Sequence, residues 1–169
     1  IALEGWGIEE MTIIPKVGLH IWWPGQNLFI PDRNPEAKSI EEQKKEILKN
    51  LEDIDEFFTQ AEAYAKRRLT APKSKTELNP SWEAMIPFVS KELPLIIHAE
   101  EKRQIVSALD WAEKRKYKII ISGGRDTWKI AERIATMRVP VIYRHVFTAP
   151  HQSNLPYDIY FKAPGILAK

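Results

Sequence analysis

The strongest constraint on the fold is a regular alternation of apolar runs and amphipathic segments in the second half of the chain. The runs "PLIIHA", "YKIIIS" and "VPVIYRHV" are largely apolar, as strands buried on both faces are. The segments between them, "EEKRQIVSALDWAEKRK" and "RDTWKIAERIATM", repeat apolar residues at helical spacing. This strand–helix–strand–helix–strand order predicts right-handed βαβ units, a parallel sheet and an α/β fold.

A long amphipathic helix is predicted for residues 39–69. Ser39 and Glu42 form an S-x-x-E capping box, which pairs two amides at the start of the helix. Apolar residues then recur at alternating spacings of four and three along one face, and the opposite face is charged. The residues of the apolar face are Ile47, Leu51, Ile54, Phe58, Ala61 and Ala65. Such a helix packs either on the core of its own chain or on a partner.

These patterns describe the parts of one predicted domain, residues 1–169. Residues 39–91 form a helical insert, a hairpin of the long helix and a shorter helix that Asn79 caps and Pro80 begins. Residues 93–169 form the βαβαβ core and end in a segment that favours a further helix. The N-terminal part, rich in Pro, Gly and aromatic residues, predicts irregular structure with one or two short strands.

Composition limits the classes of partner and of metal site. The chain has 169 residues, of which 44% are hydrophobic, enough for one domain with a core. Its formal net charge of +2 gives no reason to expect nucleic acid or a membrane surface as a partner. There is no cysteine, so a transition-metal site must use histidines and carboxylates. A cysteine-free chain suits an oxidising or a reducing compartment equally, so no localisation follows.

Functional groups of parallel α/β structures gather at the carboxyl ends of the strands. Three segments occupy such ends in this sequence: "HAE", "SGGRD" and "RH". His98 lies where a ligand of a divalent metal would lie, because an imidazole nitrogen at a strand end can bind a metal. The alternative is a structural histidine that caps a helix or bonds a backbone carbonyl.

The segment "SGGRD" has two interpretations. Gly123 and Gly124 would let backbone amides approach an anion at a helix N-terminus. However, the segment matches no established phosphate-binding motif, and Asp126 would repel a phosphate. A tight turn in which Asp126 caps the following helix is therefore favoured.

The other histidines give weaker signals. His145 and His151 flank "VFTAP" and could reach the mouth that His98 faces, although isolated histidines are more commonly loop residues. His20 lies in "GLHIWWPG" beside two tryptophans. We interpret that cluster as aromatic packing, with a binding platform as the alternative.

The segment "PLIIHAEEKRQIVSALDWAEKRKYKIIISGGRDTWKIAERIATMRVPVI" resembles the metal-dependent amidohydrolases, in particular their imidazolonepropionase-like branch. That branch has a strand ending in His-Ala, a helix of the type "I..AL..A", a strand ending in His-Gly or Gly-Gly, and a "VPV" strand. The earlier "EGWGIEEMTIIPKVGLHIWWP" is similar to the segment that precedes an inserted helical hairpin in some members.

The resemblance implies a (β/α)₈ TIM-like barrel and a metal centre that activates water for attack on an amide or imide carbonyl. The family's ligands are a His-x-His on the first strand, a Lys or Glu on the fourth, histidines on the fifth and sixth, and an Asp on the eighth. The resemblance makes "IIHA" the fifth-strand motif and His98 a ligand of a divalent metal, with zinc expected. It also implies that Gly123 and Gly124 shape the site and that Arg144 and His145 contact the substrate.

Two departures from the family pattern stand out. Gly123 occupies the position of the sixth-strand histidine, and the chain contains no His-x-His. Eight βα units also need roughly 200 residues or more. The chain therefore resembles part of a barrel, with an insert of helices between two strands.

The leading hypothesis is a fragment of an amidohydrolase-like, metal-dependent hydrolase of C–N bonds in non-peptide or dipeptide amides. Its partners would be a small-molecule amide substrate and either a second copy or the missing barrel half, which would cover open sheet edges. The alternative is a non-catalytic scaffold or dimerisation domain that uses the long helix. A third hypothesis is an anion-binding α/β module that uses "SGGRD".

Overall fold

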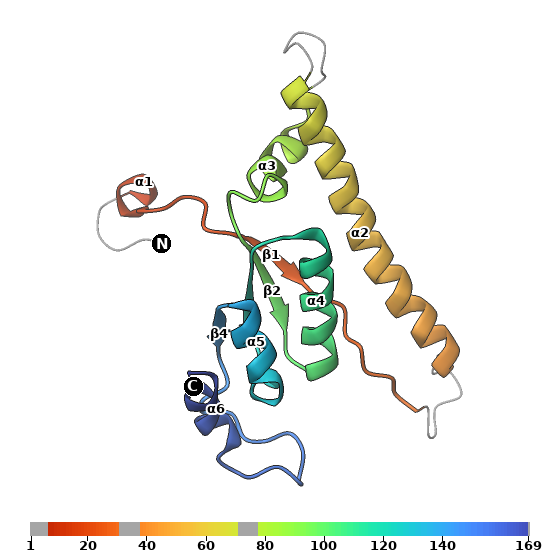
Figure 1. Cartoon of the computed structure of the whole chain (residues 1–169), viewed down its shortest axis with the longest axis vertical. Helices are drawn as coiled ribbons and strands as arrows, with labels where there is room; N and C mark the ends of the chain where they lie inside the picture. Colours follow the sequence, from red (N-terminus) through yellow and green to blue (C-terminus); the bar gives the residue numbers. More distant parts are fainter. Residues whose placement is uncertain (1–6, 31–37, 71–77, 169) are drawn as a thin grey trace.

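Four parallel strands form one sheet in the order β1-β2-β3-β4, with helices packed against it (Figure 1). This computed structural model describes residues 7–30, 38–70 and 78–168. The strands are β1 (Leu19–Trp22), β2 (Leu95–Ala99), β3 (Ile119–Gly123) and β4 (Val141–Tyr143). The helices are α1 (Ile8–Met11), α2 (Ile40–Thr70), α3 (Pro80–Val89), α4 (Lys102–Arg115), α5 (Ala131–Met137) and α6 (Ile159–Leu167), with a 3₁₀ turn, η1 (Thr127–Ile130). The predicted α/β fold with a parallel sheet is confirmed.

The two faces of the sheet differ. Successive side chains of a strand alternate between faces, so the register determines which residues lie together. One face supplies the hydrophobic core through Leu19 and Ile21, Leu95 and Ile97, Ile119 and Ile121, and Val141. On the other face Trp22, His98, Ser122 and Ile142 lie in one row, each paired with the next across the sheet. None of these four residues belongs to the core cluster, and the ends of the row, Trp22 and Ile142, are 72% and 49% exposed.

The core is completed by α4 and the C-terminal half of α2, with smaller contributions from α3 and α5. In α4 the residues Ile105, Ala108, Leu109 and Ala112 face the sheet and are buried. The predicted long helix is confirmed as α2, 31 residues long, and the Ser39–Glu42 capping box forms. Its buried residues begin only at Phe58. The N-terminal half of α2 therefore makes a much smaller contribution to the core than its apolar face predicts.

The shorter helix of the insert is α3, and it begins as predicted. The Asn79 side chain accepts the backbone N–H groups of Ser81 and Trp82, and Pro80 is the first helical residue. In the N-terminal part, the expected strand structure appears as β1, which lies at the edge of the sheet. None of the described helices has the length and apolarity of a membrane span.

Candidate functional site

The carboxyl ends of β2, β3 and β4 meet around the carboxylate of Glu100. Arg144 Nη2 donates to Oε1 at 3.0 Å, and His145 Nε2 lies 2.6 Å from Oε2. The backbone N–H of Arg125 also donates to Oε2, at 3.3 Å. One acidic side chain thus ties three strand ends together. The sequence analysis assigned no role to Glu100 beyond its place in the strand-end segment "HAE".

Gly123 and Gly124 provide the room that this arrangement needs. Gly123 has a φ of +96°, and a Cβ atom there would lie 2.4 Å from Glu100 Oε1. Gly124 has a φ of +66°, and its N–H donates to the carbonyl of Ala99 at 2.8 Å. The Gly124 amide is therefore used within the fold, which weakens the interpretation of "SGGRD" as a phosphate cradle.

Asp126 does not cap its own helix, contrary to the sequence interpretation. Its Oδ2 instead accepts the backbone N–H of Lys102 at 3.3 Å, at the first turn of α4. Its Oδ1 forms an ion pair with Lys129 Nζ at 3.0 Å. Asp126 is only 5% exposed. The loop after β3 is thus fastened to the beginning of α4 by a cross-connection that local sequence signals do not reveal.

His98 pairs with His20, a partner that the sequence analysis did not identify. The distance from His20 Nδ1 to His98 Nε2 is 2.8 Å, although 78 residues separate the two along the chain. The ring of Trp22 stacks on His98 with centroids 4.5 Å apart and an interplanar angle of 7°. The aromatic packing expected around His20 is present, and His98 is part of it.

The surroundings of His98 favour its neutral form. Burial lowers the pKa of the His98 imidazole below its ordinary value, and the nearby His20 and Arg144 lower it further. The carboxylate of Glu100 opposes these effects by raising the pKa. A neutral imidazole has a free nitrogen lone pair, which metal binding requires.

The donor chemistry of the pair fits a zinc-type ion, for which imidazole nitrogens are preferred ligands. Among the residues that the structure describes, however, no group of three or more His, Asp or Glu side chains converges on one point. Two imidazoles are fewer than the three or more protein ligands that an open catalytic zinc site needs.

The two remaining histidines, His145 and His151, lie in different environments. His145 lies beside the carboxylate of Glu100, at the same strand ends as His98. His151 instead stacks on Tyr160 and hydrogen-bonds to its hydroxyl group. The structure therefore joins His145 to the site through Glu100, while His151 packs on α6.

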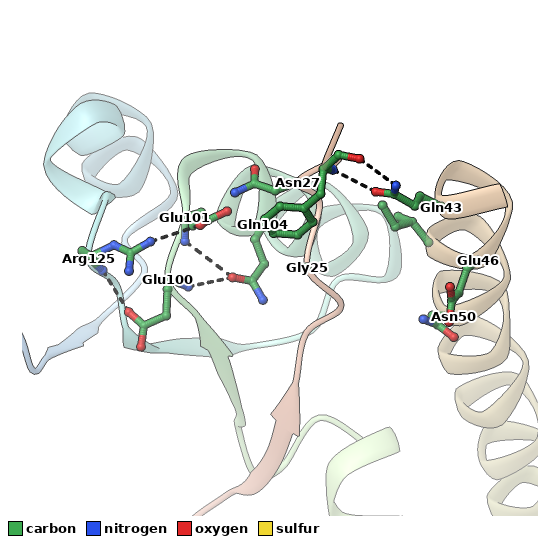
Figure 2. Close-up of a pocket in the computed structure, with 11 residues that line it drawn as sticks. Gly25, Asn27, Gln43, Glu46, Asn50, Glu100, Glu101, Gln104 and Arg125 are labelled. Carbon is green, nitrogen blue, oxygen red and sulfur yellow. Dashed lines mark hydrogen bonds and ion pairs between the residues drawn. The ribbon is translucent and has the colours of Figure 1, made fainter. Parts of the chain in front are cut away.

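An open cavity of about 490 Å³ adjoins the strand ends (Figure 2). Figure 2 shows Glu101, Gln104 and Arg125 on one side and Gln43, Glu46 and Asn50 of α2 on the other. Arg125 is paired with Glu101 at 3.1 Å, and Gln104 accepts the N–H of Glu100 and donates to the carbonyl of Trp23. These bonds fix the wall nearest to Glu100.

Comparison with known proteins supports the fold. No family model and no curated protein sequence matches this chain. A solved structure, an amidohydrolase from Thermotoga maritima MSB8, is similar over 98% of this chain with a TM-score of 0.73 and 20% sequence identity. The chain spans 42% of the length of that protein. It therefore has an amidohydrolase-like fold, equivalent to part of the longer protein.

Proposed function

We propose that this chain is part of a metal-dependent hydrolase that cleaves C–N bonds in non-peptide or dipeptide amides. The observation that carries the proposal is the position of His98. It lies at the carboxyl end of β2, in a fold that an amidohydrolase shares over nearly the whole chain. The sequence motifs favour the imidazolonepropionase-like branch of that superfamily.

The proposed architecture is a segment of a (β/α)₈ barrel. Residues 93–169 would supply successive βα units, and residues 39–91 would be an insert between two strands. The match to 42% of a longer amidohydrolase supports this arrangement. The four strands are all parallel and in sequential order, as consecutive strands of such a barrel are.

Five residues at the strand ends have a proposed role. His98 would hold a divalent metal, most suitably zinc, which when bound polarises the scissile carbonyl and lowers the pKa of water. Arg144 would bind a substrate carboxylate through its guanidinium group, which is half-exposed while paired with Glu100. His145 would contact the substrate from the other side of Glu100. Gly123 and Gly124 would shape the site by leaving space beside that carboxylate.

The test is zinc binding by the chain after removal of metal with EDTA. Equilibrium dialysis should show zinc bound by the natural sequence and lost from His98→Ala. The matched control is His151→Ala, which removes a histidine packed on Tyr160 and should retain zinc. Undiminished zinc binding by His98→Ala would overturn the proposed metal site.

Activity needs a separate assay, because the chain covers only part of the related hydrolase. The release of amine from a panel of dipeptides and N-acyl amides should be measured for a protein that includes this chain and closes the barrel. We expect hydrolysis that depends on His98 and is abolished by EDTA. Hydrolysis that persists in His98→Ala would contradict the proposal.

A second candidate function, a scaffold or dimerisation domain, is favoured by one observation. The N-terminal half of α2 has no buried residue before Phe58, and Leu48 is 59% exposed. If α2 is a docking surface, Leu48→Glu should abolish association in sedimentation experiments and leave zinc binding intact. The hydrolase proposal predicts no such effect of Leu48→Glu.

A further inference from the structure

We propose that His20 and His98 together form a two-histidine clip for a divalent transition metal, with His20 Nδ1 and His98 Nε2 as the donor atoms. The inference deepens the proposed function, because it rests on His98 as a ligand and adds a second one. The family resemblance assigns no role to His20. It implies a Lys or Glu on the strand before the His98 strand, and here that strand is β1, which carries His20.

The sheet register brings the two imidazoles together. Trp22 pairs with His98 across β1 and β2, and His20 pairs with Ile96, two residues before His98. Because residues two apart point to the same face of a strand, His20 and His98 project from one face of the sheet. Their nearest ring nitrogens are 2.8 Å apart, a hydrogen-bond distance.

A small opening of this pair would admit a metal ion. Zinc–nitrogen bonds of about 2.0–2.1 Å in tetrahedral geometry place two donor atoms about 3.3 Å apart. The pair would therefore need to open by roughly 0.5 Å from its distance of 2.8 Å. His20 is exposed and lies on an edge strand, so it can make this movement without disturbing the core.

Metal binding requires no net gain or loss of protons by the two imidazole rings. In the hydrogen-bonded pair, one neutral imidazole donates its ring N–H to the free nitrogen of the other. Metal binding requires both facing nitrogens to be unprotonated, so the shared proton moves to the outer nitrogen of its own ring through solvent. Both rings then carry their proton on the side away from the metal.

Trp22 stacks on His98 and supplies a spectroscopic signal. Its indole ring lies 4.5 Å from the His98 ring, nearly parallel to it. A paramagnetic ion held by His98 would lie close enough to quench the fluorescence of Trp22. Two imidazole donors also select Cu²⁺, Ni²⁺, Co²⁺ and Zn²⁺ over Mg²⁺ and Ca²⁺, which prefer oxygen ligands.

The experiment is a Ni²⁺ titration of the metal-free chain, followed by fluorescence and by calorimetry. Ni²⁺ should quench part of the emission, Zn²⁺ should reverse the quenching by competition, and Mg²⁺ should have no effect. Trp22→Phe should lose that part of the quenching while calorimetry still detects Ni²⁺ binding. His20→Ala and His98→Ala should each weaken binding by about tenfold or more, a loss of about 1.4 kcal/mol or more. His151→Ala serves as the matched control and should bind Ni²⁺ as the natural chain does.

The outcomes separate this inference from the proposed function. If His98→Ala loses the metal and His20→Ala binds it as tightly as the natural chain, the clip is wrong and the proposed metal site stands. If both variants bind as tightly as the natural chain, both ideas fail. Circular dichroism of His20→Ala checks that the fold is retained, and His20→Asp, which restores a ligand, should recover part of the affinity. Equal losses in the Ala and Asp variants would overturn the role of His20 as a ligand.

Discussion

At the scale of single residues, the carboxylate of Glu100 organises the strand ends. It accepts hydrogen bonds from the side chains of Arg144 and His145 and from the backbone of Arg125. There is room for this carboxylate because residue 123 is a glycine and has no side chain. The position of the Glu100 carboxylate therefore depends on the glycine at residue 123.

Gly123→Ala should destabilise the fold by about 1–3 kcal/mol, since a positive φ strains a residue with a Cβ atom. The new methyl group would also displace the carboxylate of Glu100, 2.4 Å away. Urea denaturation measures the change. Gly25→Ala is the matched control, because no atom lies within 4 Å of a Cβ placed there.

A double variant separates the two causes. Adding Glu100→Ala to Gly123→Ala removes the clash and leaves the backbone strain. The double variant should therefore lose less stability than the sum of the two single losses. Strict additivity would show that the methyl group does not displace Glu100.

The His98 pair should make stability depend on pH. Because the pKa of His98 is lowered in the folded chain, the unfolded chain takes up its proton first as pH falls below about 6.5. The stability contribution of neutral His98 is therefore intact above that pH and declines below it. Thermal unfolding in EDTA should show a shallower decline between pH 7 and pH 5 for His98→Asn. An identical decline in both proteins would contradict this expectation.

The sequence predicted the position of His98 and missed its partner. A histidine at the end of an apolar run follows from local pattern, because the strand and its end are local features. The pairing with His20 depends on which strand lies next to β2 and in which register. Neither property is encoded near either residue. The sequence analysis therefore proposed aromatic packing for His20, with a binding platform as the alternative, and did not identify His98 as its partner.

At the scale of elements, the long helix α2 is fastened to the rest of the chain at its middle. Arg115 of α4 donates to the carboxylate of Asp55 at 2.6 Å, to the Asp55 carbonyl at 2.9 Å and to Thr59 Oγ1 at 2.6 Å. The indole N–H of Trp111 donates to the same carboxylate. The aromatic ring of Phe58 packs against Trp111 beneath these polar bonds.

Arg115→Lys should cost about 1–2 kcal/mol of stability, because one ammonium group cannot reproduce the fork of bonds that the guanidinium makes. Arg115 is only 14% exposed, whereas Asp55 is 41% exposed, so water offsets part of the loss. Chemical denaturation measures the effect, with Lys114→Arg on the exposed side of α4 as the control. A change below about 0.3 kcal/mol would show that the apolar contacts alone hold α2.

Helix ends were predicted better than helix packing. The capping box of α2 and the Asn79–Pro80 start of α3 are signals contained within a few residues, and both form as predicted. The apolar face of α2 gave no indication that Leu51 and Ile54 would be only partly buried and that full burial would begin at Phe58. That limit depends on where α4 and the sheet end, which the periodicity of α2 does not contain.

At the scale of the whole molecule, the sheet has two outer strands. Within the described chain, β1 and β4 each pair on one side only. The row of residues on the face opposite the core ends in exposed apolar side chains at both strands. Open edges and exposed apolar side chains together favour association with another chain.

We therefore expect the chain to self-associate in a concentration-dependent manner, as sedimentation velocity would detect. Trp22→Lys combined with Ile142→Lys should shift the protein toward the monomer, because a buried lysine at the contact is costly. Phe161→Lys is the control, since Phe161 is a comparably exposed residue on α6. A monomer at all concentrations for the natural sequence would contradict the expectation.

The parallel sheet was predictable because βαβ order and handedness follow from the alternation of strands and helices. The addition of β1 to the same sheet was less accessible, because more than seventy residues separate β1 from β2. The strand itself was expected from its β-type residues. Its neighbour was not, because no short crossover connects the two strands.

That separation also has a consequence for the order of folding. β2, β3 and β4 are linked by short helical crossovers and can assemble from local contacts, which form quickly. Docking of β1 must close a loop that contains all of α2 and α3, and this costs more chain entropy. We expect β1 to join the sheet last and to leave it first in partial unfolding. The two histidines would then meet only in the final step. A metal bound by both would stabilise the completed sheet against the loss of β1.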